Sequence, residues 1–212
     1  MASLATLGVD GWDITNPIIP TLTPYLTTWA AKPLAAAVGK GQRICVSDLG
    51  FKLFYSNGTS WVADTNAPLA QTAVAASVTG TTNETTLGTI VVPAGMMGAS
   101  GMLRITSLWS HVASANAKVL RTRFGGTEFA TLTSSVTLAS WQSFVHIRNR
   151  TAATQVGFPA AGGNSGLGAA TVAVTPGAID TTVDQSILLT GQLASAGETI
   201  TLEGYTIEVL NA

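Results

Sequence analysis

The side chains that could bind a metal or attack a substrate are few and widely spaced in the sequence. His111 and His146 are the only histidines, and Cys45 is the only cysteine. A zinc site needs three or four ligands, and these residues show no close ligand spacing. We therefore expect no metal site, and one cysteine cannot form a disulfide within the chain.

Paired carboxylates are the second possible chemistry, because two acids several ångströms apart can cleave a glycosidic bond. Glu203 lies close in sequence to Glu208, and Asp180 lies close to Asp184. The first two are expected to face solvent or an arginine, and the other two fall in a loop-like stretch. The sequence contains no nucleophile-elbow motif, the pattern that would indicate a serine hydrolase. We therefore predict that the protein is not an enzyme and has no catalytic residues.

A glycine-rich stretch at residues 162–168 has the composition of a phosphate-binding loop but not its other features. It lacks the Lys-Ser/Thr ending and the strand-to-helix setting that direct backbone N–H groups at a phosphate. A surface turn is the simpler interpretation. We expect no cofactor.

The composition limits the partners. Lys and Arg number 10 and Asp and Glu 11 in 212 residues, so the net charge is -1, and only 10% of residues are charged. A chain with no positive surplus is not expected to bind nucleic acid. No apolar run approaches the roughly 20 residues of a membrane helix, and the first ten residues do not resemble a secretory signal. Because a free monomer normally relies on charge for solubility, we infer that other subunits cover much of the surface.

The first 40 residues differ from the rest in their proline content. Pro17, Pro20, Pro24 and Pro33 favour an extended conformation, so residues 1–40 are predicted to form an extended arm. Apolar side chains along this arm could dock on a partner or a neighbouring subunit, or could pack back on the arm's own domain. The candidate partner-binding residues are Trp12, Ile14, Ile18, Ile19, Leu22, Tyr25 and Trp29.

Residues 41–64 are predicted to form a small β-hairpin module. Phe51, Leu53 and Tyr55 alternate on one side of a strand, and Asn57-Gly58 is the dipeptide that a tight type I′ turn requires. Residues 65–84 are polar and rich in Ala and Thr, which is typical of a linker.

Residues 85–212 contain about eight strand-like segments separated by turn signals, a number typical of a β-sandwich or jelly roll. In the last segment Ile200 and Leu202 share one phase, and Tyr205 and Ile207 share the opposite one. A β-bulge at Gly204 would let both sets face the core. We therefore predict an all-β chain: an extended arm, a hairpin module and a C-terminal antiparallel jelly roll or β-sandwich.

Charge is unevenly distributed within this predicted domain. Residues 101–150 contain six Lys or Arg and one Glu, whereas residues 151–212 contain acidic residues but no Lys or Arg. These opposite charges could pair across strands of one sheet. They could also pair across a subunit interface.

Two segments resemble proteins of tailed bacteriophages. The stretch from Arg43 to Val62, with Tyr55-Ser-Asn-Gly-Thr59 at its turn and Trp61 near its end, is similar to a hairpin module of phage fibres and other virion proteins. The stretch from Ser186 to Leu210 resembles the last strands of jelly-roll domains in such proteins. The resemblance is to virion structural proteins of the head-fibre, decoration or short tail-fibre type.

This resemblance implies a structural role. It implies a homotrimer on the virion, made in the host bacterial cytoplasm, with the N-terminal arm anchored on the major capsid protein or another virion protein. The absence of a long shaft favours a capsid decoration or head fibre. The alternative is a tail-fibre or baseplate protein that recognises a host surface glycan.

Overall fold

The computed structural model describes residues 24–49, 52–63, 68–134, 138–158 and 173–210. The chain divides into two compact units, Met1–Thr65 and Asn66–Ala212. Almost all regular structure in both units is β-strand, which confirms the predicted all-β class.

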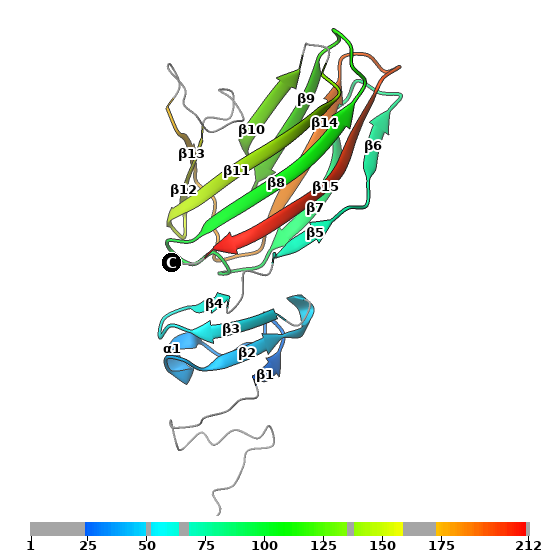
Figure 1. Cartoon of the computed structure of the whole chain (residues 1–212). Helices are drawn as coiled ribbons and strands as arrows, with labels where there is room; N and C mark the ends of the chain where they lie inside the picture. Colours follow the sequence, from blue (N-terminus) through cyan, green and yellow to red (C-terminus); the bar gives the residue numbers. More distant parts are fainter. Residues whose placement is uncertain (1–23, 50–51, 64–67, 135–137, 159–172, 211–212) are drawn as a thin grey trace, which may run out of the picture. The chain divides into compact units, whose positions relative to one another are not determined.

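The N-terminal unit contains one four-stranded sheet in the order β1-β2-β3-β4 (Figure 1). β1 runs parallel to β2, whereas β2–β3 and β3–β4 are antiparallel pairs. Trp29, Ile44, Phe54 and Trp61 are buried and form its core. The elements are β1 (Tyr25–Thr27), α1 (Ala35–Val38), β2 (Arg43–Val46), the 3₁₀ turn η1 (Ser47–Leu49), β3 (Lys52–Ser56) and β4 (Trp61–Ala63).

The β3–β4 connection differs from the predicted two-residue turn. Ser56 pairs with Trp61, so the loop has four residues, 57–60. Asn57 Oδ1 accepts hydrogen bonds from the backbone N of Thr59 at 2.9 Å and of Ser60 at 2.7 Å. Gly58 has a φ of 100°. The asparagine side chain therefore organises a longer loop, and the glycine supplies the positive φ within it.

The boundary of the predicted arm also differs from the structure. Within the arm assigned to residues 1–40, β1 and α1 belong to the same unit as β2–β4, and β1 is hydrogen-bonded to β2. Short strands of this kind carry little local signal because their stability comes from the neighbouring strand.

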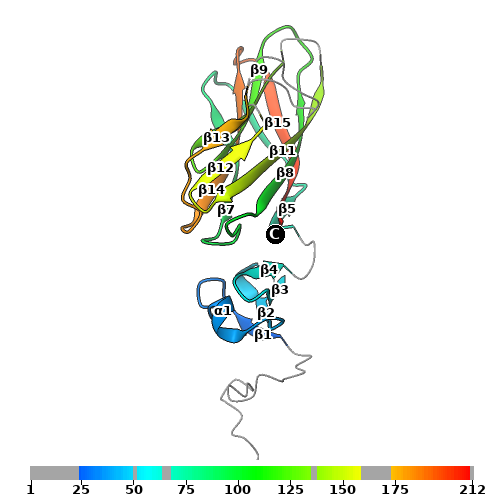
Figure 2. The ribbon, with the colours of Figure 1, turned by 90° about the vertical axis from the view of Figure 1, so that its left-hand side faces the viewer.

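The C-terminal unit is a sandwich of two antiparallel sheets (Figure 2). The smaller sheet has the order β10-β9-β14-β7, and the larger has β13-β12-β11-β8-β15, with β5 and β6 both pairing with the free side of β15. The strands are β5 (Ala70–Thr72), β6 (Ala76–Thr79), β7 (Thr85–Val92), β8 (Met102–His111), β9 (Lys118–Phe124), β10 (Thr127–Ser134), β11 (Ser140–Thr151), β12 (Thr154–Gly157), β13 (Thr175–Gly177), β14 (Gln185–Leu193) and β15 (Thr199–Leu210).

The strand order is that of a jelly roll. Eight strands form the jelly roll when β6 is counted as the first and the β12–β13 hairpin is treated as an addition. In one sheet the order of these strands is first-eighth-third-sixth, which is β6-β15-β8-β11. The other follows second-seventh-fourth-fifth, β7-β14-β9-β10. This interleaving of early and late strands is the double Greek key of the jelly roll. β5 and β6 fall inside the predicted linker 65–84, because strands of three and four residues are too short for an alternation to stand out in an Ala/Thr-rich stretch.

The core lies between the two sheets and follows the predicted alternation. Leu103, Ile105 and Trp109 of β8, in the larger sheet, and Leu120 and Phe124 of β9, in the smaller one, are all buried. The register between β15 and β8 shifts between Leu202 and Gly204, which confirms the predicted bulge. Ile200, Leu202 and Ile207, on both sides of that bulge, are buried.

Candidate functional site

Most of the predicted partner-binding residues lie outside the described residues. These are Trp12, Ile14, Ile18, Ile19 and Leu22. Tyr25 and Trp29 are described, and both belong to the N-terminal sheet unit. Tyr25 is half-buried in β1, paired with Ile44 of β2.

Trp29 is in the interior of the N-terminal unit. Its side chain is 5% exposed, and its ring centroid lies 4.9 Å from that of Phe54 at an interplanar angle of 54°. Its backbone N donates to Asp48 Oδ1 at 2.9 Å. The predicted docking role for this residue therefore does not match its position, because an aromatic ring inside the core is not presented to a partner.

Lys32 covers the Trp29 ring. Its Nζ lies 4.0 Å from the ring centroid and donates to the Trp29 carbonyl at 2.9 Å. Burial lowers the pKa of Lys32, and the nearby Asp48 carboxylate acts in the opposite direction. The contacts of Lys32 with Trp29 lie within the chain between β1 and α1, and the packing of Trp29 on Phe54 and its hydrogen bond to Asp48 hold that chain against the rest of the unit.

Two further contacts attach residues 33–35 to the hairpin. Trp61 Nε1 donates to the Pro33 carbonyl at 2.8 Å, and Ser56 Oγ donates to the Ala35 carbonyl at 2.8 Å. Ser56 and Trp61 are both buried. The indole thus satisfies its only donor inside the unit while its ring fills the core.

The apolar side chains that this unit does expose are different ones. Among its described residues, Leu26 is 59% exposed and Leu34 is 79% exposed. Neither residue is among the predicted partner-binding residues, although Leu26 is one of the apolar side chains of the predicted arm and alternates with the inward-facing Thr27 on β1. Strand alternation could have identified Leu26, whereas Leu34 carries no such signal.

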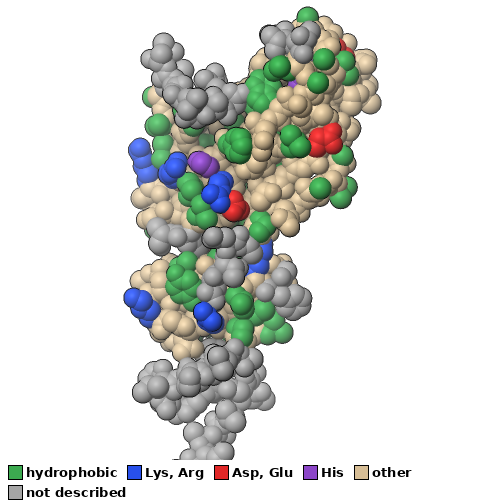
Figure 3. Space-filling view, in the orientation of Figure 1, with side chains coloured by type: hydrophobic (Ala, Val, Ile, Leu, Met, Phe, Trp, Pro, Cys, Tyr) green, Lys and Arg blue, Asp and Glu red, His purple; other side chains and the backbone are tan. Residues whose placement is uncertain are grey.

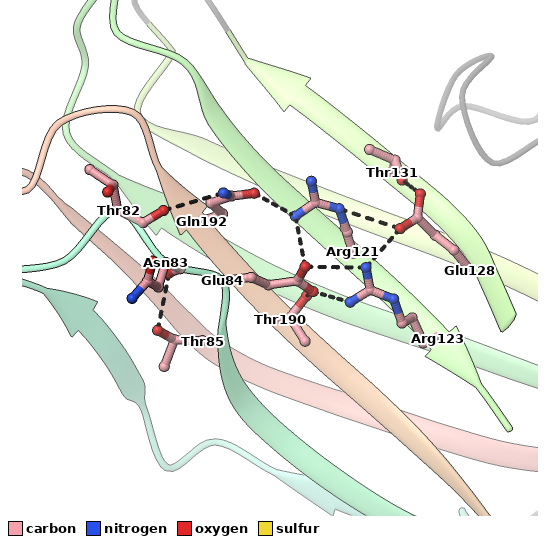
Figure 4. A network of polar contacts seen from close by, with 10 residues as sticks. All are labelled: Thr82, Asn83, Glu84, Thr85, Arg121, Arg123, Glu128, Thr131, Thr190 and Gln192. Atoms are coloured by element: carbon pink, nitrogen blue, oxygen red, sulfur yellow. Dashed lines mark hydrogen bonds and ion pairs between the residues drawn. The ribbon is translucent and has the colours of Figure 1, made fainter. Parts of the chain in front are cut away.

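A network of two arginines and two glutamates lies on the outer face of the smaller sheet (Figure 4). Arg121 Nε and Arg123 Nη2 contact Glu128 Oε2 at 3.3 and 3.0 Å. Arg121 Nη1 lies 3.3 Å from Glu84 Oε2, and Arg123 also pairs with Glu84. The Arg123 hydrogen bond is the main reason that the pKa of Glu84 is lowered. Each arginine is matched by a carboxylate, so the network adds no net charge to this face.

A buried ion pair joins Lys118, the first residue of β9, to Glu198 in the loop between β14 and β15. Lys118 Nζ is 3.1 Å from Glu198 Oε2, and the Lys118 side chain is fully buried. Glu198 Oε1 accepts from Ser114 Oγ at 2.5 Å and from Asn116 Nδ2 at 2.9 Å. These bonds, that of Ser114 first, lower the pKa of Glu198 to about 2. The cluster joins these two parts of the chain. Removing Glu198 would leave the buried Lys118 without its counter-charge, which is strongly destabilising.

The candidate catalytic carboxylates take part in separate structural contacts. Glu208 pairs with Arg104 through two bonds of 2.5 and 2.8 Å, and Glu203 accepts from Ser110. Asp180 Oδ1 accepts from the backbone N of Thr182 at 2.9 Å. Asp184 Oδ1 accepts from the backbone N of Ala94 at 2.8 Å. Arg104–Glu208 joins neighbouring strands of one sheet, which confirms the predicted cross-strand pairing at this position. Lys118–Glu198 also pairs within the chain, but Glu198 lies in the loop before β15.

The two histidines face opposite sides of the larger sheet. His111 is buried at the end of β8, and its Nε2 has no hydrogen-bond partner among the described residues. His146 lies on the outer face of β11, opposite Arg104 of β8. No group of three His, Cys, Asp or Glu side chains suited to a metal ion occurs within the described ranges.

The outer face of the larger sheet carries the second group of cations. Along β11, Phe144, His146, Arg148 and Arg150 project outward, because Ser143, Val145, Ile147 and Asn149 between them are buried. We call these four residues the β11 strip. Figure 3 shows blue basic side chains and a purple histidine gathered on this face.

The described helices include none long and apolar enough to cross a membrane.

Comparisons with known proteins give little guidance. No known family's sequence profile matches this chain, and no curated protein does. Among solved structures, dimeric latent PorU from Porphyromonas gingivalis is 12% identical, with a TM-score of 0.34, over 74% of this chain and 15% of that one. The CBM2 module of the evolved Dit of Lactobacillus casei BL23 phage J-1 is 9% identical, with a TM-score of 0.30, over 58% of this chain and 69% of that one. Such low scores carry no argument about function.

Proposed function

We propose that this protein is a structural component of a tailed-phage virion: a capsid-surface decoration or head fibre that assembles as a homotrimer. Residues 1–23 anchor it on the major capsid protein or another virion protein, and the jelly roll is its outer part. The mechanism is binding, without catalysis or a cofactor.

The organisation of the chain is the observation that carries this proposal. Twenty-three residues with seven Leu, Ile or Val, one tryptophan and two prolines precede a small sheet with its own aromatic core, and a jelly roll follows. A free segment in water has no reason to carry Trp12, Ile18 and Ile19, whereas a segment that docks on a partner does. The similarity of Arg43–Val62 to a hairpin module of phage fibres agrees with this assignment.

The pairing of charges within the jelly roll supports its assembly with other subunits. Arg104, Lys118, Arg121 and Arg123 each have a carboxylate partner in the same chain. Burying a surface that carries unpaired charges would cost several kcal/mol per ion. The parts of the surface whose charges are matched avoid most of that cost; Arg148 and Arg150, which have no ion-pair partner among the described residues, are the exceptions. Many equivalent weak contacts on a symmetric shell add up to firm attachment.

Deletion of residues 1–23 tests the anchor. This boundary keeps β1 and Trp29, so the N-terminal unit retains its core. The truncated chain should be folded and soluble but absent from particles assembled in its presence. A full-length control carrying Lys40→Gln, an exposed position outside the deleted segment, should be incorporated normally. Normal incorporation of the truncated chain would refute the anchor.

The mass of the purified protein tests the trimer. One chain has a mass of 21.6 kDa, and light scattering should give about three times that value. A monomer at micromolar concentration would contradict trimerisation.

A further inference from the structure

The β11 strip has the geometry of an extended binding surface. Phe144, His146, Arg148 and Arg150 alternate along one strand, and neighbours two residues apart on a strand lie roughly 6.6 Å apart. The four side chains therefore span about 20 Å. Thr106, Arg104 and Met102 of β8 lie directly beside the first three, so the surface is continued on the next strand.

The strip differs from the other basic positions of the jelly roll in its lack of counter-charges. Arg104 is paired with Glu208, and both arginines of the opposite sheet are paired with glutamates. The ion pairs among the described residues include neither Arg148 nor Arg150, and both of these side chains are exposed. In a protein with so few charges, two adjacent unpaired arginines on one strand favour an anionic ligand.

An aromatic ring at one end adds a different kind of contact. Phe144 is 57% exposed and Leu108, on the adjacent strand, is 48% exposed. The flat face of an aromatic ring packs well against the C–H face of a sugar ring. Gln142 and Thr106 beside it offer an amide and a hydroxyl for sugar hydroxyl groups.

His146, between the aromatic and the cationic ends, is suited to a polar and uncharged contact. Burial lowers its pKa most, and the charges of Arg148 and Arg104 lower it further. The imidazole is therefore neutral at pH 7, with one donor and one acceptor nitrogen for hydroxyl groups.

We propose that the β11 strip binds an acidic polysaccharide, with a sugar ring on Phe144 and anionic groups on Arg148 and Arg150. Nucleic acid fits less well, because its binding normally uses several phosphate contacts and the chain has a net charge of -1. A second copy of the chain fits less well too. Glu84, Glu128, Glu198 and Glu208, four of the carboxylates that such a copy could offer, already pair with cations of their own jelly roll.

The test is a binding titration of the purified full-length protein with four probes. Polygalacturonate carries carboxylates, poly(glycerol phosphate) carries phosphodiesters, dextran is neutral, and a twenty-residue oligothymidylate represents nucleic acid. At least one of the two anionic carbohydrate-type polymers should bind, more weakly at higher salt, and dextran should not. The difference in affinity between polygalacturonate and poly(glycerol phosphate) shows which anionic group the arginines prefer.

Variants locate the site. Arg148→Gln with Arg150→Gln, and separately Phe144→Ala, should each weaken binding about tenfold or more. Lys40→Gln and Val91→Ala are the controls, since they remove an exposed charge and an exposed apolar side chain elsewhere and should leave binding unchanged. Circular dichroism shows whether each variant is folded.

Three results would overturn the proposal: no binding of either anionic polymer, equal loss of binding in the control variants, or tighter binding of oligothymidylate than of both polymers. Because this assay needs no virus particles, its failure would leave the anchoring role of residues 1–23 untouched.

Discussion

Replacing Trp29 with alanine should unfold the N-terminal unit and leave the jelly roll intact. Burying a tryptophan removes about 150–250 Å² from water, which at about 25 cal/mol per Å² corresponds to roughly 4–6 kcal/mol. Measured Trp-to-Ala changes in cores cost about 3–5 kcal/mol. A single core in a unit of this size rarely supplies more than about 3–5 kcal/mol in total. The loss is therefore comparable to the whole stability of the unit.

Hydrogen exchange followed by mass spectrometry measures both units in one experiment. In Trp29→Ala, peptides covering β2 and β3 should lose protection, while peptides covering β8 and β9 should exchange as in the unchanged protein. Leu26→Ala is the matched control. It removes an apolar side chain from the same segment, but one that is 59% exposed, so its cost should stay within about 0.5 kcal/mol.

Full protection of β2 and β3 in Trp29→Ala would refute the structural role of this side chain. If such a folded variant also failed to join particles, Trp29 would be a docking residue, as its place in the predicted arm suggested. Loss of protection in both units together would contradict their independence.

Two further predictions concern the jelly roll. Gly204→Ala should lower the stability by about 1–3 kcal/mol in thermal melts, because the new Cβ would lie 2.6 Å from the Thr72 carbonyl oxygen; Gly197→Ala, with its nearest atom at 4.0 Å, should change little. Equal melting of the two variants would contradict the tight bulge. Hydrogen bonding, chiefly from Ser114, lowers the pKa of Glu198 from 4.5 to about 2. The stabilising effect of this carboxylate should therefore be complete above pH 4.5 and lost as the pH falls through about 2. Urea unfolding at several pH values should show a weaker acid dependence in Glu198→Gln, and an unchanged acid dependence would contradict the assignment.

Strand alternation predicted much of the jelly roll because each strand has one buried face. In residues 141–148 Ser143, Val145 and Ile147 alternate with Gln142, His146 and Arg148, and the burial along β11 follows this alternation. The change of phase around Gly204 likewise located the bulge. These features depend on the order of side chains along one strand, which the sequence contains directly.

The missed features depend on partners distant in sequence. β6 exists as a strand because Val78 and its neighbours pair with β15, more than a hundred residues away, and the alternation of its own four residues is too short to indicate a strand. Trp29 is buried because Phe54 and Lys32 enclose it, although the surrounding prolines indicated an extended arm. The β11 strip follows from alternation as well, but only the ion pairs show that Arg148 and Arg150 differ from the other arginines.

Immunogold labelling of purified particles with an antibody against the jelly roll tests the proposed role most directly. The account predicts gold on the outside of the capsid in regular numbers per particle, and loss of that label when residues 1–23 are deleted. Particles that contain none of this chain would contradict it.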